Sequence, residues 1–253
     1  MHATHATFAP YWRSYLIEAR CEFLRMLREP AFCVPVIAFP AMFYLLFGVL
    51  LNRGNAGAAQ YLLASYGTFG VIGAALFGFG VSIAADRDRG YLRLRRALPT
   101  PTGAPLLAKM AMAMLFAAVI SVVLALLAAT LGGVSLAPAQ WLGLLVANIG
   151  GVLPFAAIGL YVGSLVSGSA APALLNVLYL PMAFLSGLWL PLSMLPGWLA
   201  GTAPVWPAYH LGQLALKVVG HDAGQPAWLH LLVLAAVTLV FFMLAQRRLA
   251  AAD

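Results

Sequence analysis

Long apolar runs constrain this sequence most strongly, because each is about as long as a membrane core is thick. A helix needs about 20 apolar residues to cross that core, and six stretches reach this length without a charged residue in the middle. They are Phe32–Leu51, Leu62–Ala85, Leu106–Leu131, Trp141–Leu165, Ala170–Leu190 and Trp228–Ala245. The runs lack the alternation of apolar and polar residues that a barrel strand shows. The sequence therefore predicts an all-α membrane protein, with six transmembrane helices in a single domain over residues 1–253.

The composition indicates the same environment. Only 8% of the 253 residues are Asp, Glu, Lys or Arg, whereas a soluble domain has about 25%. So few charges leave the surface of a soluble protein uncovered, and a chain that is 63% apolar does not stay solvated as a disordered one. The net charge of +7 is also found in nucleic-acid-binding proteins. Here the basic residues cluster beside the apolar runs, so we expect a lipid bilayer and no nucleic acid as partner.

The basic residues also predict the orientation in the membrane. If the N-terminus is cytosolic, twelve of the 14 Lys and Arg residues lie on the cytosolic side, and only Arg53 and Lys217 lie outside. Cytoplasmic loops are enriched in Lys and Arg, so we expect both termini in the cytosol of a multi-pass cell-membrane protein. Lys109 stands at the edge of the third run, where its long side chain is expected to reach the interface with water.

Several functional classes lack their usual sequence signals. Ion-driven carriers commonly bind the coupling ion at a charged residue inside the membrane, and no run has one in its middle. Backbone carbonyls at broken helices also bind sodium, so an ion-coupled secondary carrier stays an alternative. The sequence lacks a phosphate loop and a His-Glu-x-x-His zinc motif. We therefore expect a chain that is not an enzyme and holds no metal or cofactor, with any ATP bound by another chain.

Three segments between the runs carry further information. In residues 8–29, apolar residues recur at helical spacing, which predicts an amphipathic helix on the cytosolic surface, either as a plain anchor or as an elbow touching a partner. In residues 86–105, charges of alternating sign precede Gly90 and two prolines. They predict a short helix that docks on a protein. The alternative is that the basic residues only reflect the usual excess of Lys and Arg in cytoplasmic loops. Residues 191–227 form an apolar external hairpin, which either re-enters the outer leaflet or lies on its surface.

A few small or polar residues lie within the apolar runs. Thr68, Asn148 and Asn176 are expected to contact a transported molecule or to form hydrogen bonds between helices. Gly159 and Gly163 are four residues apart, a spacing that lets helices in membranes approach closely.

Five short motifs occur in order along the chain. They are Arg28-Glu29-Pro30 before the first run, Asp86-Arg87-Asp88-Arg89-Gly90 after the second, Pro99-Thr100-Pro101 followed by Lys109, Leu185-Ser186-Gly187 in the fifth, and Pro196-x-Trp198 with Pro207 and Tyr209 in the hairpin. Together they resemble the type-2 ATP-binding-cassette (ABC) permease family over nearly the whole chain. Asp86 and Asp88 replace the family's more common glutamates, and Tyr91 stands where threonine is usual.

The resemblance implies the membrane subunit of an ATP-driven ABC exporter. Two copies of the chain would pair, and two copies of a separate cytosolic ATPase subunit would bind them and hold ATP and Mg²⁺. The implied ATPase contacts are Asp86, Arg87, Asp88, Arg89, Gly90, Arg93 and Pro101 in the coupling loop, with Arg25, Arg28 and Glu29 on the elbow helix. The implied contacts along the cargo path are Thr68, Asn148, Asn176, Phe184 and Trp189.

The sequence and the resemblance also give expectations about the cargo and about the membrane in which the protein lies. Because the runs offer no charged cavity, we expect an amphipathic or hydrophobic cargo, such as a drug, a lipid or a glycolipid. The resemblance favours a bacterial inner membrane. A membrane scaffold that only recruits an ATPase would carry the same docking features and stays an alternative to an exporter.

Overall fold

The computed structural model describes residues 11–91 and 104–251, and all the regular elements in these ranges are helices. The first half contains α1 (Tyr11–Leu27), α2 (Pro30–Phe43), the π-helical turn η1 (Tyr44–Leu50), α3 (Ala56–Asp88) and α5 (Ala104–Thr130). The second half contains α6 (Pro138–Gly150), α7 (Val152–Leu165), α8 (Ala171–Leu185), η2 (Leu192–Met194), α9 (Gly197–Ala200), η3 (Ala203–Val205), α10 (Pro207–Val219) and α11 (Ala227–Ala251). The expected all-α fold is confirmed.

Five helical stretches in the described residues are long and apolar enough to cross a membrane. They are Pro30–Leu50, Ala56–Asp88, Leu106–Thr130, Pro138–Leu165 and Ala227–Leu249. The fifth predicted run, Ala170–Leu190, is shorter in the structure, where α8 has 15 residues and ends at Leu185. Gly187 follows with φ of +78°, a left-handed conformation that commonly ends a helix. At 1.5 Å per residue, α8 is about 22 Å long, which is less than the membrane core.

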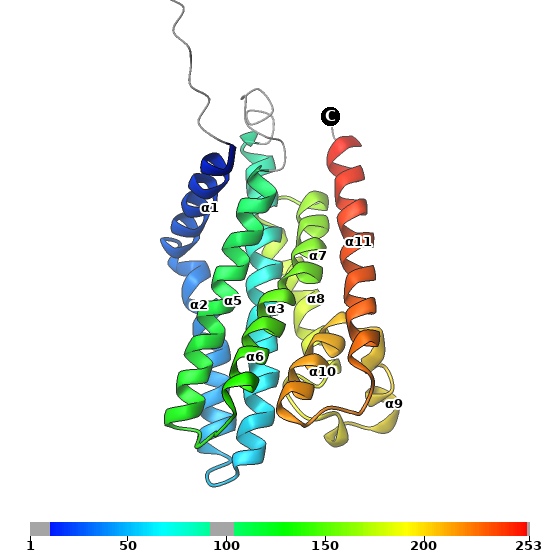
Figure 1. The fold of residues 1–253 in the computed structure, drawn as a ribbon. Helices are drawn as coiled ribbons and strands as arrows, with labels where there is room; N and C mark the ends of the chain where they lie inside the picture. Colours follow the sequence, from blue (N-terminus) through cyan, green and yellow to red (C-terminus); the bar gives the residue numbers. More distant parts are fainter. Residues whose placement is uncertain (1–10, 92–103, 252–253) are drawn as a thin grey trace, which may run out of the picture.

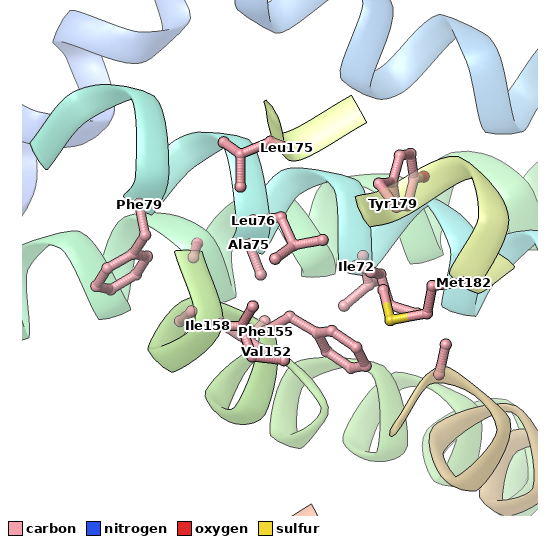
Figure 2. Packing of buried hydrophobic residues seen from close by; sticks show 14 of the residues in the cluster. Ile72, Ala75, Leu76, Phe79, Val152, Phe155, Ile158, Leu175, Tyr179 and Met182 are labelled. Carbon is pink, nitrogen blue, oxygen red and sulfur yellow. The ribbon is translucent and has the colours of Figure 1, made fainter. Parts of the chain in front are cut away.

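The long helix α3 is the centre of the bundle (Figure 1) and contacts α2, α5, α7, α8 and α10. Most of its side chains between Leu62 and Asp86 are buried. Figure 2 shows Ile72 and Leu76 of α3 beside Phe155 of α7 in the apolar core, with Phe79 farther along α3. By contrast, α2 and α11 expose apolar side chains on their outer faces, a surface suited to lipid or to another protein rather than to water.

Glycines bring α7 close to α3, as the spacing of Gly159 and Gly163 predicts. A Cβ atom added to Gly159 would lie 2.6 Å from the carbonyl oxygen of Leu76, and one added to Gly163 would overlap the carbonyl of Gly80. Both obstacles are backbone atoms, which cannot rotate away as a side chain can. The two helices can therefore pack at this distance only without side chains at these positions.

We expect Gly159→Ala to destabilise the protein by about 1–3 kcal/mol, because α7 must move away from α3. Gly150→Ala is the matched control, since no atom lies within 4 Å of its added Cβ. The measurement is the unfolding free energy of each purified variant in mixed micelles, from helical circular dichroism during titration with SDS. Equal unfolding free energies for the two variants would show that the close packing of α7 against α3 at Gly159 does not stabilise the protein.

The two ends of the bundle differ. The helix α1 and the C-terminal end of α11 lie at one end, and α9 and α10 lie at the other (Figure 1). The helix predicted over residues 8–29 is α1 as far as the structure describes it, and its Phe23 ring packs 5.5 Å from Phe116 of α5. The prolines of the hairpin stand at helix starts: Pro196 precedes α9, and Pro207 is the first residue of α10.

Candidate functional site

Four charged side chains meet at the α1 end of the bundle. The Lys109 ammonium of α5 lies 3.0 Å from a carboxylate oxygen of Asp86 in α3 and 3.3 Å from one of Glu22 in α1. Lys109 also donates a hydrogen bond of 3.1 Å to the Ser82 hydroxyl. Both terminal nitrogens of Arg25 donate to Asp86 at 3.2 Å. This charge network, defined as Glu22, Arg25, Asp86 and Lys109 with Ser82, joins α1, α3 and α5.

The charge network replaces water as the partner of Lys109. The expectation that Lys109 reaches the water interface is wrong, because the residue is only 1% exposed. Glu22 and Asp86 are each 3% exposed and compensate the buried ammonium. Two carboxylates and two cations balance, as buried charges require. The network is therefore suited to holding three helices in one arrangement rather than to binding a transported ion.

The last turn of α3 is tied to the neighbouring helices by the residues that follow Asp86. Arg87 donates to the carbonyl oxygens of Gly163 at 3.1 Å, Ser164 at 2.7 Å and Val166 at 3.3 Å. These carbonyls end α7, where a helix leaves such groups without partners and favours a positive charge. Asp88 accepts a 2.7 Å hydrogen bond from the Gly168 backbone N–H.

These contacts divide the predicted coupling residues into two sets. Asp86, Arg87 and Asp88 belong to α3 itself rather than to a separate helix that begins at Asp86, and each one contacts another helix or loop of this chain. Arg89 is exposed, and Gly90 has φ of +72°, a left-handed conformation that ends α3.

The other predicted contact residues of the cytosolic segments lie close by or cannot be placed. Arg28 and Glu29 are exposed at the turn between α1 and α2, whereas Arg25 points its charged group into the charge network. Arg93 and Pro101 lie outside the described residues. The structure thus leaves Arg28, Glu29 and Arg89 accessible at this end of the bundle.

A groove runs along α2, α3 and α8 from the same end. It consists of two adjoining cavities of about 600 Å³ and 430 Å³. The two cavities share the lining residues Ala31, Phe32, Phe77 and Pro172. The first cavity is lined partly by charged residues: Arg25, Glu29, Asp88 and Arg89. The second is lined mainly by apolar and aromatic residues, with Asn176 as a polar exception. We call the two cavities together the α2–α8 groove.

Two of the five predicted cargo-path residues line the α2–α8 groove. Asn176 lies on its wall and donates a 3.1 Å hydrogen bond to the Pro172 carbonyl in its own helix. Trp189 stacks on Phe43, with ring centroids 6.0 Å apart. Phe184 meets the Trp189 ring edge-on at 6.3 Å. Phe184 and Trp189 are therefore in contact, and Trp189 lines the same cavity as Asn176.

The other two residues lie apart from the α2–α8 groove. Asn148 of α6 donates a 2.9 Å hydrogen bond to Ser121 of α5, the contact between helices that was one of its two expected roles. Thr68 is fully buried in α3. Sequence reasoning missed Tyr179, which lines the groove and donates a 2.7 Å hydrogen bond to the Phe69 carbonyl. Its position three residues after Asn176, on the same face of a helix, is a signal that could have found it.

Comparison with known proteins agrees with this arrangement. The family model described as "ABC-2 type transporter" matches residues 14–220, which include most of α1, the charge network and the α2–α8 groove. The chain belongs to the ABC-2 type transporter family. This ABC-2 transporter chain is also similar to the Bacillus subtilis (strain 168) protein named "Putative transport permease YvfS". The two share 28% identity over 229 residues, which cover 89% of this chain and 92% of the relative.

Membership of the ABC-2 family gives the coarse function. The chain is a multi-pass membrane permease, a type of subunit that is generally not an enzyme itself. The family in general works with an ATP-binding-cassette partner. The charge network and the α2–α8 groove are therefore features of a transport subunit.

Proposed function

We propose that this chain is the membrane subunit of an ATP-driven exporter for an amphipathic molecule such as a drug, a lipid or a glycolipid. The observation that carries the proposal is the α2–α8 groove, which has charged residues at one end and apolar and aromatic residues along the rest. An amphipathic cargo has the same division. Its polar group suits the charged end of the groove, and its apolar part suits the cavity lined by aromatic rings.

The size of the groove supports a small-molecule or lipid-sized cargo. Each of its cavities has a volume within the range of about 300–1,000 Å³ that is typical of ligand sites. The helices on both sides of it expose apolar side chains, including Val34 and Phe39 of α2 and Val177 of α8. A second copy of the chain placed against these faces would close the groove and give a path between two subunits.

The proposed orientation places the charged end of the groove in the cytosol. In this arrangement α8 counts as a sixth, short span, both termini are cytosolic, and α9 and α10 belong to an external hairpin that re-enters the outer leaflet. The excess of Lys and Arg at the α1 end supports this orientation, and the membrane is proposed to be a bacterial inner membrane. Cargo would enter from the cytosol or from the inner leaflet.

The energy would come from a separate cytosolic ATPase, with two copies per pair of permease chains and with ATP and Mg²⁺ bound by the ATPase. Arg28, Glu29 and Arg89 are exposed at the α1 end and are proposed to contact it, together with Arg93 and Pro101. The charge network links α1 to α3 and α5, so that movement of the elbow helix would reach both helices that flank the coupling loop.

The experiment that tests the proposal is purification of the tagged chain from its native host in a mild detergent, followed by mass spectrometry of the proteins that accompany it. We expect a soluble ATPase with a phosphate-loop motif in equal amount to the permease. An isolated permease without such a partner, in several detergents, would contradict the proposal and favour an ion-coupled carrier.

We expect Asn176→Trp to lower transport at least tenfold, because the indole fills the α2–α8 groove. Leu232→Trp on α11 is the control, since Leu232 is 59% exposed and lines neither cavity of the groove. The measurement is ATP-dependent uptake of Hoechst 33342 and of a fluorescent phospholipid into inverted vesicles that contain the permease and its ATPase. Equal losses for both variants, with the complex intact, would place the cargo path elsewhere.

A further inference from the structure

Two buried histidines join α10 to α11 at the end of the bundle opposite to α1. The Nδ1 atom of His210 lies 2.9 Å from the Nδ1 atom of His230, and Nε2 of His210 lies 2.9 Å from the carbonyl oxygen of Pro204. His210 is 4% exposed and His230 is 1% exposed. This pair is separate from the α2–α8 groove and from the charge network, and the proposed transport function does not use it.

The contacts determine where the protons of the neutral pair lie. A carbonyl oxygen only accepts hydrogen bonds, so Nε2 of His210 must carry a proton and donate it to Pro204. In a neutral imidazole the other nitrogen is then an acceptor. Nδ1 of His210 therefore accepts a hydrogen bond from Nδ1–H of His230, which fixes the tautomers of both rings.

While the hydrogen bond between His210 and His230 is in place, which we call the closed form, the pair can bind one additional proton but not two. One proton can bind to Nε2 of His230 and leave the hydrogen bond to His210 in place. A second proton has to bind to Nδ1 of His210, which would set two N–H groups against each other at 2.9 Å. It would also place two positive charges in a buried site. The hydrogen bond between the rings is lost when both rings are charged, which weakens the contact of α10 with α11.

The neighbouring charged groups do not relieve this repulsion. The Tyr209 ring lies 5.3 Å from the His210 ring, and burial raises the pKa of its phenol, so it is neutral below pH 10. Lys217 on α10 hydrogen-bonds Asp222 at 2.6 Å. That bond holds the pKa of the Asp222 carboxyl below its usual range, so Asp222 stays ionised above pH 4.

Titratable groups on the other helices that pack against α10 are directed elsewhere. α6 has none in its sequence. The hydroxyls of Tyr61 and Tyr66 in α3 donate to the carbonyls of Gly187 and Trp189. In α8, Tyr179 donates to α3. On α11, Arg247 and Arg248 lie near the opposite end of the helix.

We propose that the His210–His230 pair is an acid-sensitive latch that holds the α9–α10 segment against α11 and releases it when both rings bind protons. The open form binds more protons than the closed form. By linkage, the closed form is therefore favoured at high pH and is lost as the pH falls, by up to about tenfold per pH unit for each extra proton. Unperturbed imidazoles titrate near pH 6.5, so opening is expected between pH 7.5 and pH 5.0, where Asp222 does not titrate.

The test measures the position of the segment directly. Cys21 and Cys33, which are free thiols, are replaced by serine. Spin labels are then attached at Val205 on η3 and at Leu131 beyond α5, which are 80% and 58% exposed. Pulsed electron paramagnetic resonance gives the distance between the labels for the full chain in lipid nanodiscs from pH 7.5 to pH 5.0. We expect one narrow distance at pH 7.5 and a broad distribution at pH 5.0.

Three variants separate the latch from other effects of pH. His210→Gln and His230→Gln are each expected to abolish the pH dependence of the distance. His221→Gln, which removes an exposed histidine two residues beyond α10, is expected to retain it. An unchanged wild-type distance at pH 5.0, or a pH dependence that persists in both His210→Gln and His230→Gln, would overturn the proposal. The measurement needs neither cargo nor ATPase, so its outcome is independent of the exporter proposal.

Discussion

Lys109→Met is expected to destabilise the protein by about 3–5 kcal/mol, because it removes the buried cation that lies between the carboxylates of Glu22 and Asp86. The Lys109 ammonium lies 3.3 Å from Glu22 and 3.0 Å from Asp86. Arg25, whose side chain is 38% exposed, stays 3.2 Å from Asp86 but lies 3.9 Å from Glu22, so it only partly replaces Lys109. The measurement is the unfolding free energy in mixed micelles. A loss below about 1 kcal/mol would show that the network contributes no more than surface ion pairs do.

A triple variant provides the control for Lys109→Met. Glu22→Gln, Asp86→Asn, Lys109→Met removes the three buried charges together and keeps only the partly exposed Arg25, and replacing buried ion pairs with neutral groups is often neutral or stabilising. We therefore expect the triple variant to regain most of the stability that Lys109→Met loses. If the triple variant is instead as unstable as the single one, the loss comes from the packing of the Lys109 side chain rather than from its charge.

The helices could be predicted from the sequence because few backbone structures are stable in the core of a lipid bilayer. Backbone polar groups in a membrane must be paired within the chain, so an apolar run of sufficient length becomes a helix. The four predicted runs other than Ala170–Leu190 and Phe32–Leu51 are helical. However, Trp141–Leu165 is divided at Gly151 into α6 and α7, and α3 and α11 extend beyond the predicted bounds. In Phe32–Leu51 the helix changes to a π-turn from Tyr44, a local choice with no signal in the apolar pattern. The end of α8 depends on the positive φ of Gly187, and glycines are too common in this chain for that one to be recognised.

The charge network could not be predicted, because its members are far apart in the sequence. Glu22 and Asp86 look like ordinary surface charges beside an apolar run, and Lys109 looks like a residue at the membrane interface. Only the packing of α1 across α3 and α5 brings them together. The apolar side of α1 was visible in the sequence, but the helices that it packs against were not.

Arg87 and Arg89 are two residues apart, and we expect their substitutions to have different effects. Arg87→Gln should destabilise the protein by about 1.5–3 kcal/mol, because three carbonyl oxygens at the end of α7 lose a charged donor. Arg89→Glu should change stability by less than about 0.5 kcal/mol, as is usual for an exposed position. It should lower the amount of ATPase that copurifies with the permease at least tenfold, because it reverses a charge at the proposed docking surface.

Each variant is measured twice, by unfolding in mixed micelles and by the ratio of ATPase to permease after purification. The two readouts distinguish structure from docking, since Arg87→Gln acts on the first and Arg89→Glu on the second. Arg53→Glu, on an exposed residue in the turn between η1 and α3, is a charge-reversal control that should affect neither. If Arg89→Glu leaves the ratio unchanged while Arg87→Gln lowers it, the ATPase recognises the position of the α3 end, which Arg87 fixes, rather than the exposed charge beyond it.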